Sequence, residues 1–156
     1  MRNTDVTKDV HITVTGTQFD EDGHRTVTEQ KVQGQYFERD GSRYLLYEER
    51  DSDTGTVTKN TIKIKESAVE LSRNGYISSR MVFCPGETHR TSHVTPYGIL
   101  TLDIYTESLK SVWAEKNGTL QVAYRMYAEE NLLSENKLSV KVTDRTKTRS
   151  DFSEKV

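Results

Sequence analysis

The feature that most restricts the fold of this chain is a repeated alternation of apolar and polar residues. Val10, Ile12 and Val14 occupy every second position of one segment, and the same period returns in LTLDI (100–104), TLQVAYRMY (119–127) and KLSVKV (137–142). A period of two places the apolar side chains on one face of a β-strand. Sequences rich in Gly, Pro, Asn and Asp, such as EDGH, RDGS, RNGY and TPYG, separate the segments and predict turns. The pattern predicts about nine or ten short antiparallel strands.

These strands follow one another closely, without room for long crossover connections. The simplest all-β fold is therefore an up-and-down antiparallel meander closed into a barrel of about eight to ten strands, because closure removes exposed sheet edges. A sandwich of two sheets is the alternative. Asn117-Gly118 is the preferred pair for a type I′ turn and predicts a hairpin there. Residues 106–116 fit either a continued strand or a helical turn, since Leu109, Val112 and Trp113 also share a helical stripe.

The composition agrees with a single barrel domain. The 156 residues are 33% hydrophobic and 29% charged, a balance that suits an antiparallel sheet with one face in water. Residues 1–9 and 144–156 are polar and lack an apolar period. The sequence therefore predicts flexible tails on either side of one domain at residues 10–143.

Charge and cysteine content restrict the partners and the compartment. The 22 basic and 24 acidic residues are mixed along the chain and give a net charge of −2, so no basic surface for nucleic acid or an anionic membrane is expected. A single cysteine, Cys84, leaves no internal disulfide and is typical of a reducing compartment. The chain shows no signal segment and no apolar stretch of membrane-spanning length, so a cytoplasmic location is expected.

The histidines at 89 and 93 raise the question of a metal site, because residues four apart meet on a helix. Threonines, a valine and the following proline indicate a strand instead. Four strand residues span about 13 Å, too far for one zinc ion to bind both side chains. Cys84 is interpreted as a structural thiol at a strand end. Without a serine–histidine–aspartate order, a phosphate loop or a CxxC motif, the sequence predicts no metal, no cofactor and no catalytic residue.

Arg73 is the most informative charged residue, because it is in phase with Val69 and Leu71 at the end of a strand. A guanidinium on an apolar face is costly unless it is paired. A salt bridge to Glu48 or Glu49 at the barrel rim is the first interpretation. The second is a cation at the barrel mouth that binds an anionic ligand.

Two other segments carry residues that could bind a ligand. Arg125-x-Tyr127 matches the carboxylate-binding pair of fatty-acid-binding barrels, but both side chains are expected to lie opposite the apolar face and therefore in water. TPYG at 95–98 predicts a turn that leaves Tyr97 at its tip. His93 precedes this turn closely enough to lie at the same rim.

Several segments in order resemble the YwiB-like family of small bacterial domains of unknown function. They are QYFERDGSRYLLYEE, TIKIKESAVELSRNG, MVFCPGETHRTSHVTPYGILTLDIYT, NGTLQVAYRMY and NKLSVKV, and together they cover about residues 10 to 142. The resemblance implies a calycin-type barrel similar to lipocalins, although the Gly-x-Trp of true lipocalins is missing, since Gly16 is followed by Thr17 and Gln18. It implies no activity, and fold alone does not transfer ligand transport.

The sequence thus favours a non-catalytic binding module, whose barrel mouth accepts a small molecule or a peptide in a cavity of at least about 300 Å³. The candidate ligand-binding residues are Arg73, His93, Tyr97, Glu48 and Tyr124. An interaction or structural barrel that docks as a dimer or on a partner protein is the alternative, with an interior filled by Tyr36, Tyr44, Tyr47 and Tyr124. The chain is expected to be a monomer or a homodimer. An enzyme using His93 with Glu48 or Asp103 is the third hypothesis.

Overall fold

The computed structural model describes residues 7–145, and these residues form an antiparallel barrel of ten strands. The strands are β1 Lys8–Asp20, β2 Arg25–Arg39, β3 Ser42–Arg50, β4 Val57–Ile64, β5 Val69–Asn74, β6 Ser79–Phe83, β7 Thr88–Thr95, β8 Gly98–Ala114, β9 Asn117–Ala128 and β10 Asn131–Asp144. The predicted all-β meander is confirmed. Within the described range no helix is long and apolar enough to cross a membrane.

The sheet begins and ends slightly beyond the predicted domain. Strand β1 starts at Lys8 and β10 continues to Asp144, so the ladder includes short pieces of both segments that the sequence assigned to tails. The rest of those two segments, residues 1–6 and 146–156, lies outside the described residues.

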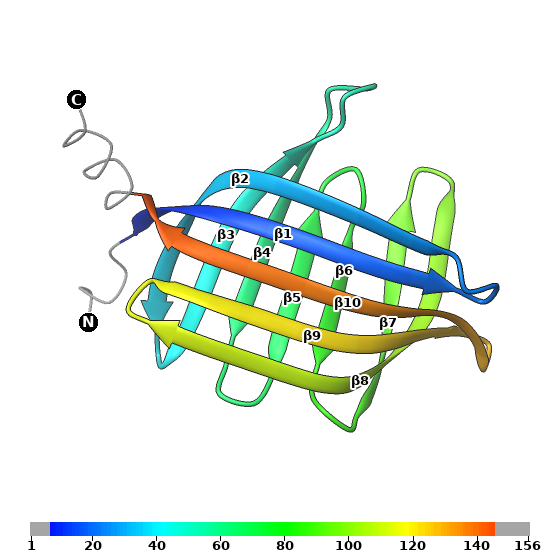
Figure 1. Ribbon diagram of the computed structural model, residues 1–156. Coiled ribbons are helices and arrows are strands. Elements are labelled where there is room, and N and C mark those ends of the chain that lie inside the picture. Colours follow the sequence, from blue (N-terminus) through cyan, green and yellow to red (C-terminus); the bar gives the residue numbers. More distant parts are fainter. Residues whose placement is uncertain (1–6, 146–156) are drawn as a thin grey trace.

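Strand order follows chain order around the barrel, with the first and last strands side by side. The order is β6-β5-β4-β3-β2-β1-β10-β9-β8-β7, and every neighbouring pair is antiparallel. Figure 1 shows β2, β1, β10, β9 and β8 crossing in front of the more steeply inclined β3 to β7. The two ends of this order, β6 and β7, are joined by a single backbone bridge between Ser78 and Val94. The barrel is therefore nearly closed, with a seam between β6 and β7.

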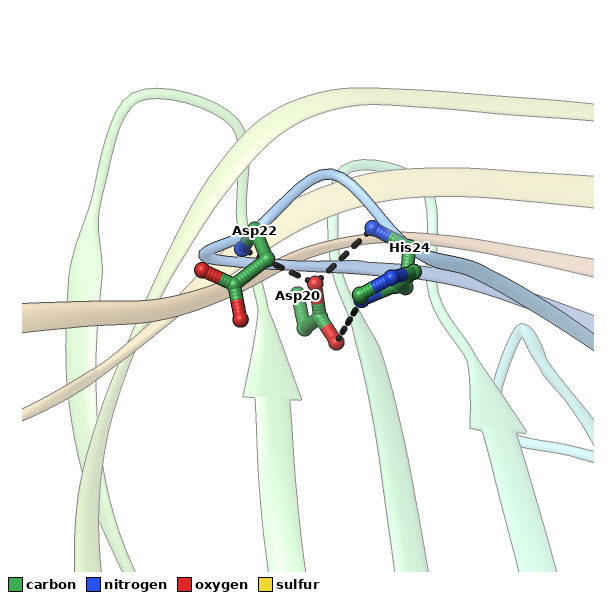
Figure 2. Close-up of side chains that lie close together, drawn as sticks. All are labelled: Asp20, Asp22 and His24. Carbon is green, nitrogen blue, oxygen red and sulfur yellow. Dashed lines mark hydrogen bonds and ion pairs between the residues drawn. The ribbon is translucent and has the colours of Figure 1, made fainter.

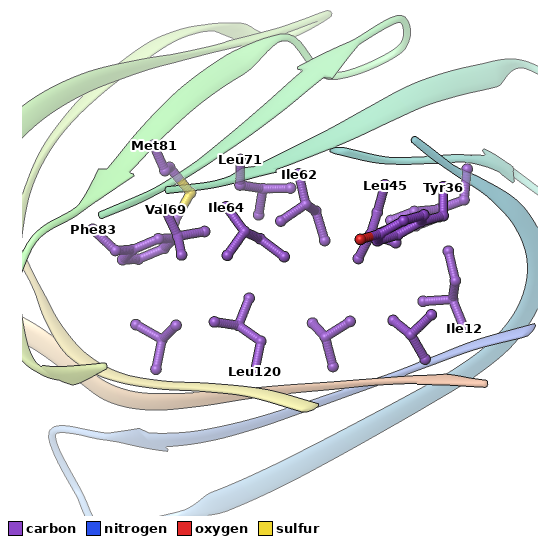
Figure 3. Close-up of a cluster of buried hydrophobic side chains, with 14 of the residues drawn as sticks. Ile12, Tyr36, Leu45, Ile62, Ile64, Val69, Leu71, Met81, Phe83 and Leu120 are labelled. Carbon is purple, nitrogen blue, oxygen red and sulfur yellow. The ribbon is translucent and has the colours of Figure 1, made fainter. Parts of the chain in front are cut away.

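The inward face of the strands forms one apolar core. The alternation seen in the sequence buries Val10 and Ile12 on β1, Leu120 and Val122 on β9, and the corresponding positions of the other strands. Figure 3 shows that these side chains meet between two walls, with Leu45, Ile62, Ile64, Val69 and Leu71 on one side and Ile12 and Leu120 on the other. Leu100 departs from the pattern: it lies near the start of β8 and is 51% exposed.

One end of the barrel is closed by aromatic and cationic side chains. Tyr36 and Trp113 lie with ring centroids 6.0 Å apart, and the Arg43 guanidinium is 5.0 Å from the centroid of Trp113. Arg43 also donates to the Tyr36 hydroxyl at 2.5 Å and to the carbonyl of Glu115 at 3.1 Å. These contacts connect β2, β3 and the β8–β9 turn, so the barrel is filled at this end.

Two predictions about the β8–β9 region are resolved by the strand register. Residues 106–116 continue the strand: β8 runs to Ala114, with an irregularity between Thr106 and Ser108. The turn prediction at Asn117-Gly118 was wrong by two residues, since Ala114 pairs with Asn117 and the turn itself is Glu115-Lys116. Glu115 adopts a φ of 61°, a conformation that Asn or Gly would have adopted more easily.

Candidate ligand-binding site

The open end of the barrel holds a cavity of about 400 Å³. Along several strands the inward face changes from apolar to polar toward this end: Val10, Ile12 and Val14 are followed by Gly16 and Gln18 on β1. Strand β10 changes in the same way, from Val140 and Leu138 to Asn136. The cavity forms because the large aliphatic side chains stop before the strands do. Its walls are Val14, Gly16, Thr17, Gln18, Thr28, Gln30, Tyr47, Glu49, Ile62, Leu71, Arg73, Tyr124, Asn136, Lys137 and Leu138.

Arg73 is placed in this cavity by three adjacent strands. In the ladder it is opposite Asn60 of β4 and Ser79 of β6, so the side chains of these residues lie on the same inward face. The Arg73 Nε is buried and has no hydrogen-bond partner among the described residues. A guanidinium in a partly buried site is costly without a charged partner, so Arg73, which lines the cavity, is a natural binding point for an anionic group.

The predicted salt bridge between Arg73 and Glu48 or Glu49 was wrong. No carboxylate of the described residues lies within 4.0 Å of the Arg73 guanidinium nitrogens. Glu48 is exposed, because it alternates with the buried Tyr47 and therefore points out of the barrel. Glu49 does line the cavity, but its Oε1 accepts from Asn60 Nδ2 at 3.1 Å.

The charge of Arg73 acts on three titratable groups around it. Burial, together with the negative charge of Glu49, raises the pKa of Tyr47 to about 12, and Arg73 opposes this shift. Burial also raises the pKa of Tyr124, again against the effect of Arg73. The pKa of His93 is lowered by burial and further by the positive charge of Arg73. At neutral pH both phenols are therefore protonated and the imidazole is uncharged.

The five residues selected from the sequence fall in different places. Arg73 and Tyr124 line the cavity together. His93 is half-buried and close enough to feel the charge of Arg73, but it is not part of the cavity wall. Tyr97 is 92% exposed at the β7–β8 turn. Glu48 lines a separate groove on the outer side of the wall, between β2 and β4.

Sequence reasoning did not select several of the polar cavity residues. Gln30 and Asn136 lie on the inward face, in phase with Val32 and Leu138, and Glu49 was expected only as a salt-bridge partner of Arg73. Tyr47 was considered only as a side chain that fills the barrel. The signal that could have found them is the strand period itself, continued two and four residues past the last aliphatic position. Tyr44, also considered as interior, instead stacks on Phe37 with ring centroids 4.7 Å apart, on the face opposite the buried Leu45.

Three other residues considered for chemistry have structural partners. His89 and His93 lie on the strand β7, as predicted, and His89 Nε2 is 2.9 Å from Glu87 Oε1. Partial burial and the neighbouring Glu87 raise the pKa of the Cys84 thiol, which disfavours the reactive thiolate. Arg125 Nη2 forms an ion pair with Glu107 Oε2 at 2.6 Å, on the face opposite the core as predicted.

The β1–β2 turn contains the only group of potential metal ligands in the part of the chain that the structure describes. Figure 2 shows Asp20, Asp22 and His24, all of which are exposed. Asp20 Oδ1 accepts from the backbone N–H groups of Asp22 and His24, both at 2.9 Å. These bonds are those of a side-chain-capped turn, the interpretation that the sequence suggested for this segment.

Comparison with known proteins identifies the family. Residues 12–140 match the model of a domain of unknown function, DUF1934. The chain is 30% identical over 109 residues to the uncharacterized beta-barrel protein YwiB of Bacillus subtilis (strain 168), covering 70% of this chain and 75% of that protein. The crystal structure of the ywiB protein from Bacillus subtilis has the same fold, with a TM-score of 0.80 at 23% identity over 91% of this chain and 96% of that chain. On this sequence match and this shared fold, the chain belongs to the DUF1934 family of YwiB-like β-barrels.

Proposed function

We propose that this protein is a non-catalytic binding module, which holds a small molecule in the cavity at the open end of its barrel. The observation that carries the proposal is the cavity itself. Its volume of about 400 Å³ lies within the range of small-molecule sites, about 300–1,000 Å³. At the opposite end Tyr36, Arg43 and Trp113 pack against one another and occupy the space between the strands.

The wall of the cavity has the composition of a binding site. Aliphatic side chains of Ile62, Leu71 and Leu138 provide a floor, and a few polar groups converge above it. Among these, Arg73 Nε has no hydrogen-bond partner within the described residues, and the Tyr124 hydroxyl is protonated at neutral pH. Small-molecule sites combine apolar surface with polar groups at fixed positions, and in this cavity the polar side chains outnumber the aliphatic ones.

A thermal-shift screen with a broad metabolite library tests the proposal. A ligand that binds only the folded protein stabilises it and raises the melting temperature further as its concentration increases above the Kd. Gln30→Trp, which places a large ring in the cavity from β2, should abolish the upshift. The matched control is Gln121→Trp, on the exposed face of β9, which should leave it intact. No upshift across the library, or an upshift that Gln30→Trp retains, would remove the proposal.

An interaction barrel is the second candidate, and an exposed apolar hairpin favours it. On β7, β8 and their turn, Val94, Tyr97, Ile99 and Leu100 are 45%, 92%, 70% and 51% exposed. Exposed apolar clusters of this kind often mark protein contacts. If this surface forms a dimer, light scattering at high concentration will give twice the mass of one chain, and Ile99→Glu will restore the monomer.

The non-catalytic part of the proposal rests on the surroundings of His93. Neither of the carboxylates considered as its partner forms a hydrogen bond or ion pair with it: Glu48 points out of the barrel, and Asp103 pairs with Arg90 at 2.9 Å. His93 Nε2 has no hydrogen-bond partner in the described part of the chain. His93→Ala is therefore expected to leave ligand binding in the cavity largely intact.

A further inference from the structure

Arg73 lines the cavity, and its guanidinium forms no ion pair with a carboxylate of the described residues. The two acids that could have neutralised this side chain are occupied elsewhere or point away: Glu49 accepts from Asn60, and Glu48 faces the outside. A guanidinium binds carboxylate and phosphate oxygens through two parallel N–H groups, a geometry that few other ligand groups match. We therefore expect the Arg73 guanidinium to bind an anionic group of a ligand.

The wall across the cavity from Arg73 carries polar side chains beside the aliphatic Val14 and Leu138. Strands β1, β2 and β10 contribute Gln18, Thr28, Gln30 and Asn136, which offer amide and hydroxyl groups. A long aliphatic chain would leave these groups without partners, and buried polar groups without partners are costly. A ligand body that carries hydroxyl groups can satisfy them.

We propose that the cavity binds a small hydrophilic organic anion, whose carboxylate or phosphate group accepts hydrogen bonds from Arg73 while its hydroxyl groups bond to the opposite wall. This inference rests on the proposed binding function and specifies the ligand class. Tyr47 and Tyr124 flank Arg73 as additional hydroxyl donors. The cavity of about 400 Å³ accommodates a molecule of the size of a hexose acid or a hexose phosphate.

Glu49 determines where the anionic group can lie. Its carboxylate lines the same cavity, beside Asn60, the ladder partner of Arg73, and it repels a negative charge bound close to it. Glu49→Gln removes this repulsion and keeps an oxygen that can accept from Asn60. The substitution should tighten anion binding severalfold; weaker binding would show that a cationic group of the ligand contacts Glu49, and would overturn the proposal.

Nuclear magnetic resonance titration of the full chain provides the main test. Gluconate supplies a carboxylate on a hydroxylated body, and glucose 6-phosphate supplies a phosphate; glucose is the neutral control and octanoate the aliphatic one. The readouts are the Nε–H signal of Arg73, assigned by its loss in Arg73→Lys, and the amide signals of Gln30 and Asn136. At least one of the two hydroxylated anions should shift all three, and the one that does so distinguishes carboxylate from phosphate recognition.

Arg73→Met should weaken the binding of that anion by about tenfold to a hundredfold, because a hydrogen bond to a charged group is lost. Arg90→Met is the matched control, since Arg90 is an exposed arginine paired with Asp103, and it should leave the affinity unchanged. If glucose or octanoate binds this cavity as tightly as the hydroxylated anions, or if Arg73→Met binds them equally well, the ligand class is wrong while the binding function stands. If none of these compounds and none of the metabolite library binds, both are overturned.

Discussion

Arg73 determines the electrostatics of the open end of the barrel. Its charge acts on a histidine and two tyrosines, and none of these forms a salt bridge with it. An uncompensated charge in a partly desolvated site influences its neighbours more strongly than a charge at the surface. The pKa values of the histidine and the two tyrosines therefore depend on the position of the Arg73 guanidinium.

Arg73→Met should raise the pKa of His93. Both burial and the charge of Arg73 lower this pKa, and the substitution removes only the second cause. Titration of the His93 ring proton signals by nuclear magnetic resonance measures the change, and Arg90→Met serves as the control at a distant arginine. An unchanged His93 pKa in Arg73→Met would place the guanidinium too far from the imidazole to act on it.

Tyr47 should make the stability of the protein depend on alkaline pH. Its pKa is raised from 10.0 to about 12 in the folded state, so folding favours the protonated phenol. The resulting stabilisation is complete below pH 10 and is lost as the pH rises through 12. Relative to Tyr47→Phe, the wild type should lose up to about 2 kcal/mol of unfolding free energy over this range. Urea denaturation at several pH values measures the unfolding free energies of the wild type and of Tyr47→Phe. If their difference stays constant from pH 9 to 12, the raised pKa of Tyr47 is contradicted.

The sequence predicted the inward face of Arg73 correctly but not its partners. Position on a face follows from the period of one strand, and the run Val69, Leu71, Arg73 was sufficient for it. A side-chain partner depends on the register between strands and on which face of the neighbour it occupies. Glu48 failed as a partner because it is one residue out of phase, and Glu49 because Asn60 is closer to it.

The β8–β9 hairpin combines a turn with part of the closed end. Its glycine, Gly118, lies in the ladder opposite Trp113, and a Cβ at this position would overlap the indole ring and the carbonyl of Val112. Asn117 is also used away from the turn, because its Oδ1 accepts from the backbone N–H of Asp144 at 2.7 Å. These packing roles explain why the two residues lie in the strand rather than at the turn where local preference would place them.

Gly118→Ala should destabilise the protein by about 1–3 kcal/mol, the usual cost of forcing extra atoms into a packed site. The new methyl group must displace Trp113, the one tryptophan of the sequence, so its fluorescence reports both the displacement and the unfolding in urea. Gly16→Ala is the control, since the nearest atom to its added Cβ is the flexible Thr28 Oγ1 at 3.3 Å. Equal stability of the two variants would show that the indole does not need the space above Gly118.

At the level of the whole molecule, the fold was predictable because each strand is local and carries a clear period. Hairpin connections need no long-range information, and a meander follows from them. The location of the cavity was not predictable in the same way. It depends on the inward positions of several strands changing from aliphatic to polar at the same end, as Leu138 to Asn136 and Leu71 to Arg73 do. The relative heights of these positions are known only once the registers are known.

The seam between β6 and β7 is the weakest part of the wall. Two backbone hydrogen bonds between Ser78 and Val94, at 2.8 and 3.0 Å, and one from the Thr91 hydroxyl to the Arg80 carbonyl, at 2.6 Å, connect the two edges. Every other neighbouring pair of strands forms a ladder, of five residue pairs between β5 and β6 and of eleven between β1 and β10. Regions with few hydrogen bonds open locally at lower free energy than the whole fold. Native-state hydrogen exchange should therefore show β6 and β7 opening before β1 and β10.

Thr91→Val tests this directly, because it keeps the shape of a side chain that is 6% exposed and removes only its hydroxyl. The Arg80 carbonyl loses its donor, which should cost about 1 kcal/mol and accelerate exchange about fivefold, in β6 and β7 alone. Thr101→Val, on the exposed face of β8, should not accelerate hydrogen exchange in any strand. If Thr91→Val accelerates β1 and β10 as much as β6 and β7, the seam opens only when the whole barrel unfolds, and the barrel behaves as a single cooperative wall despite its incomplete closure.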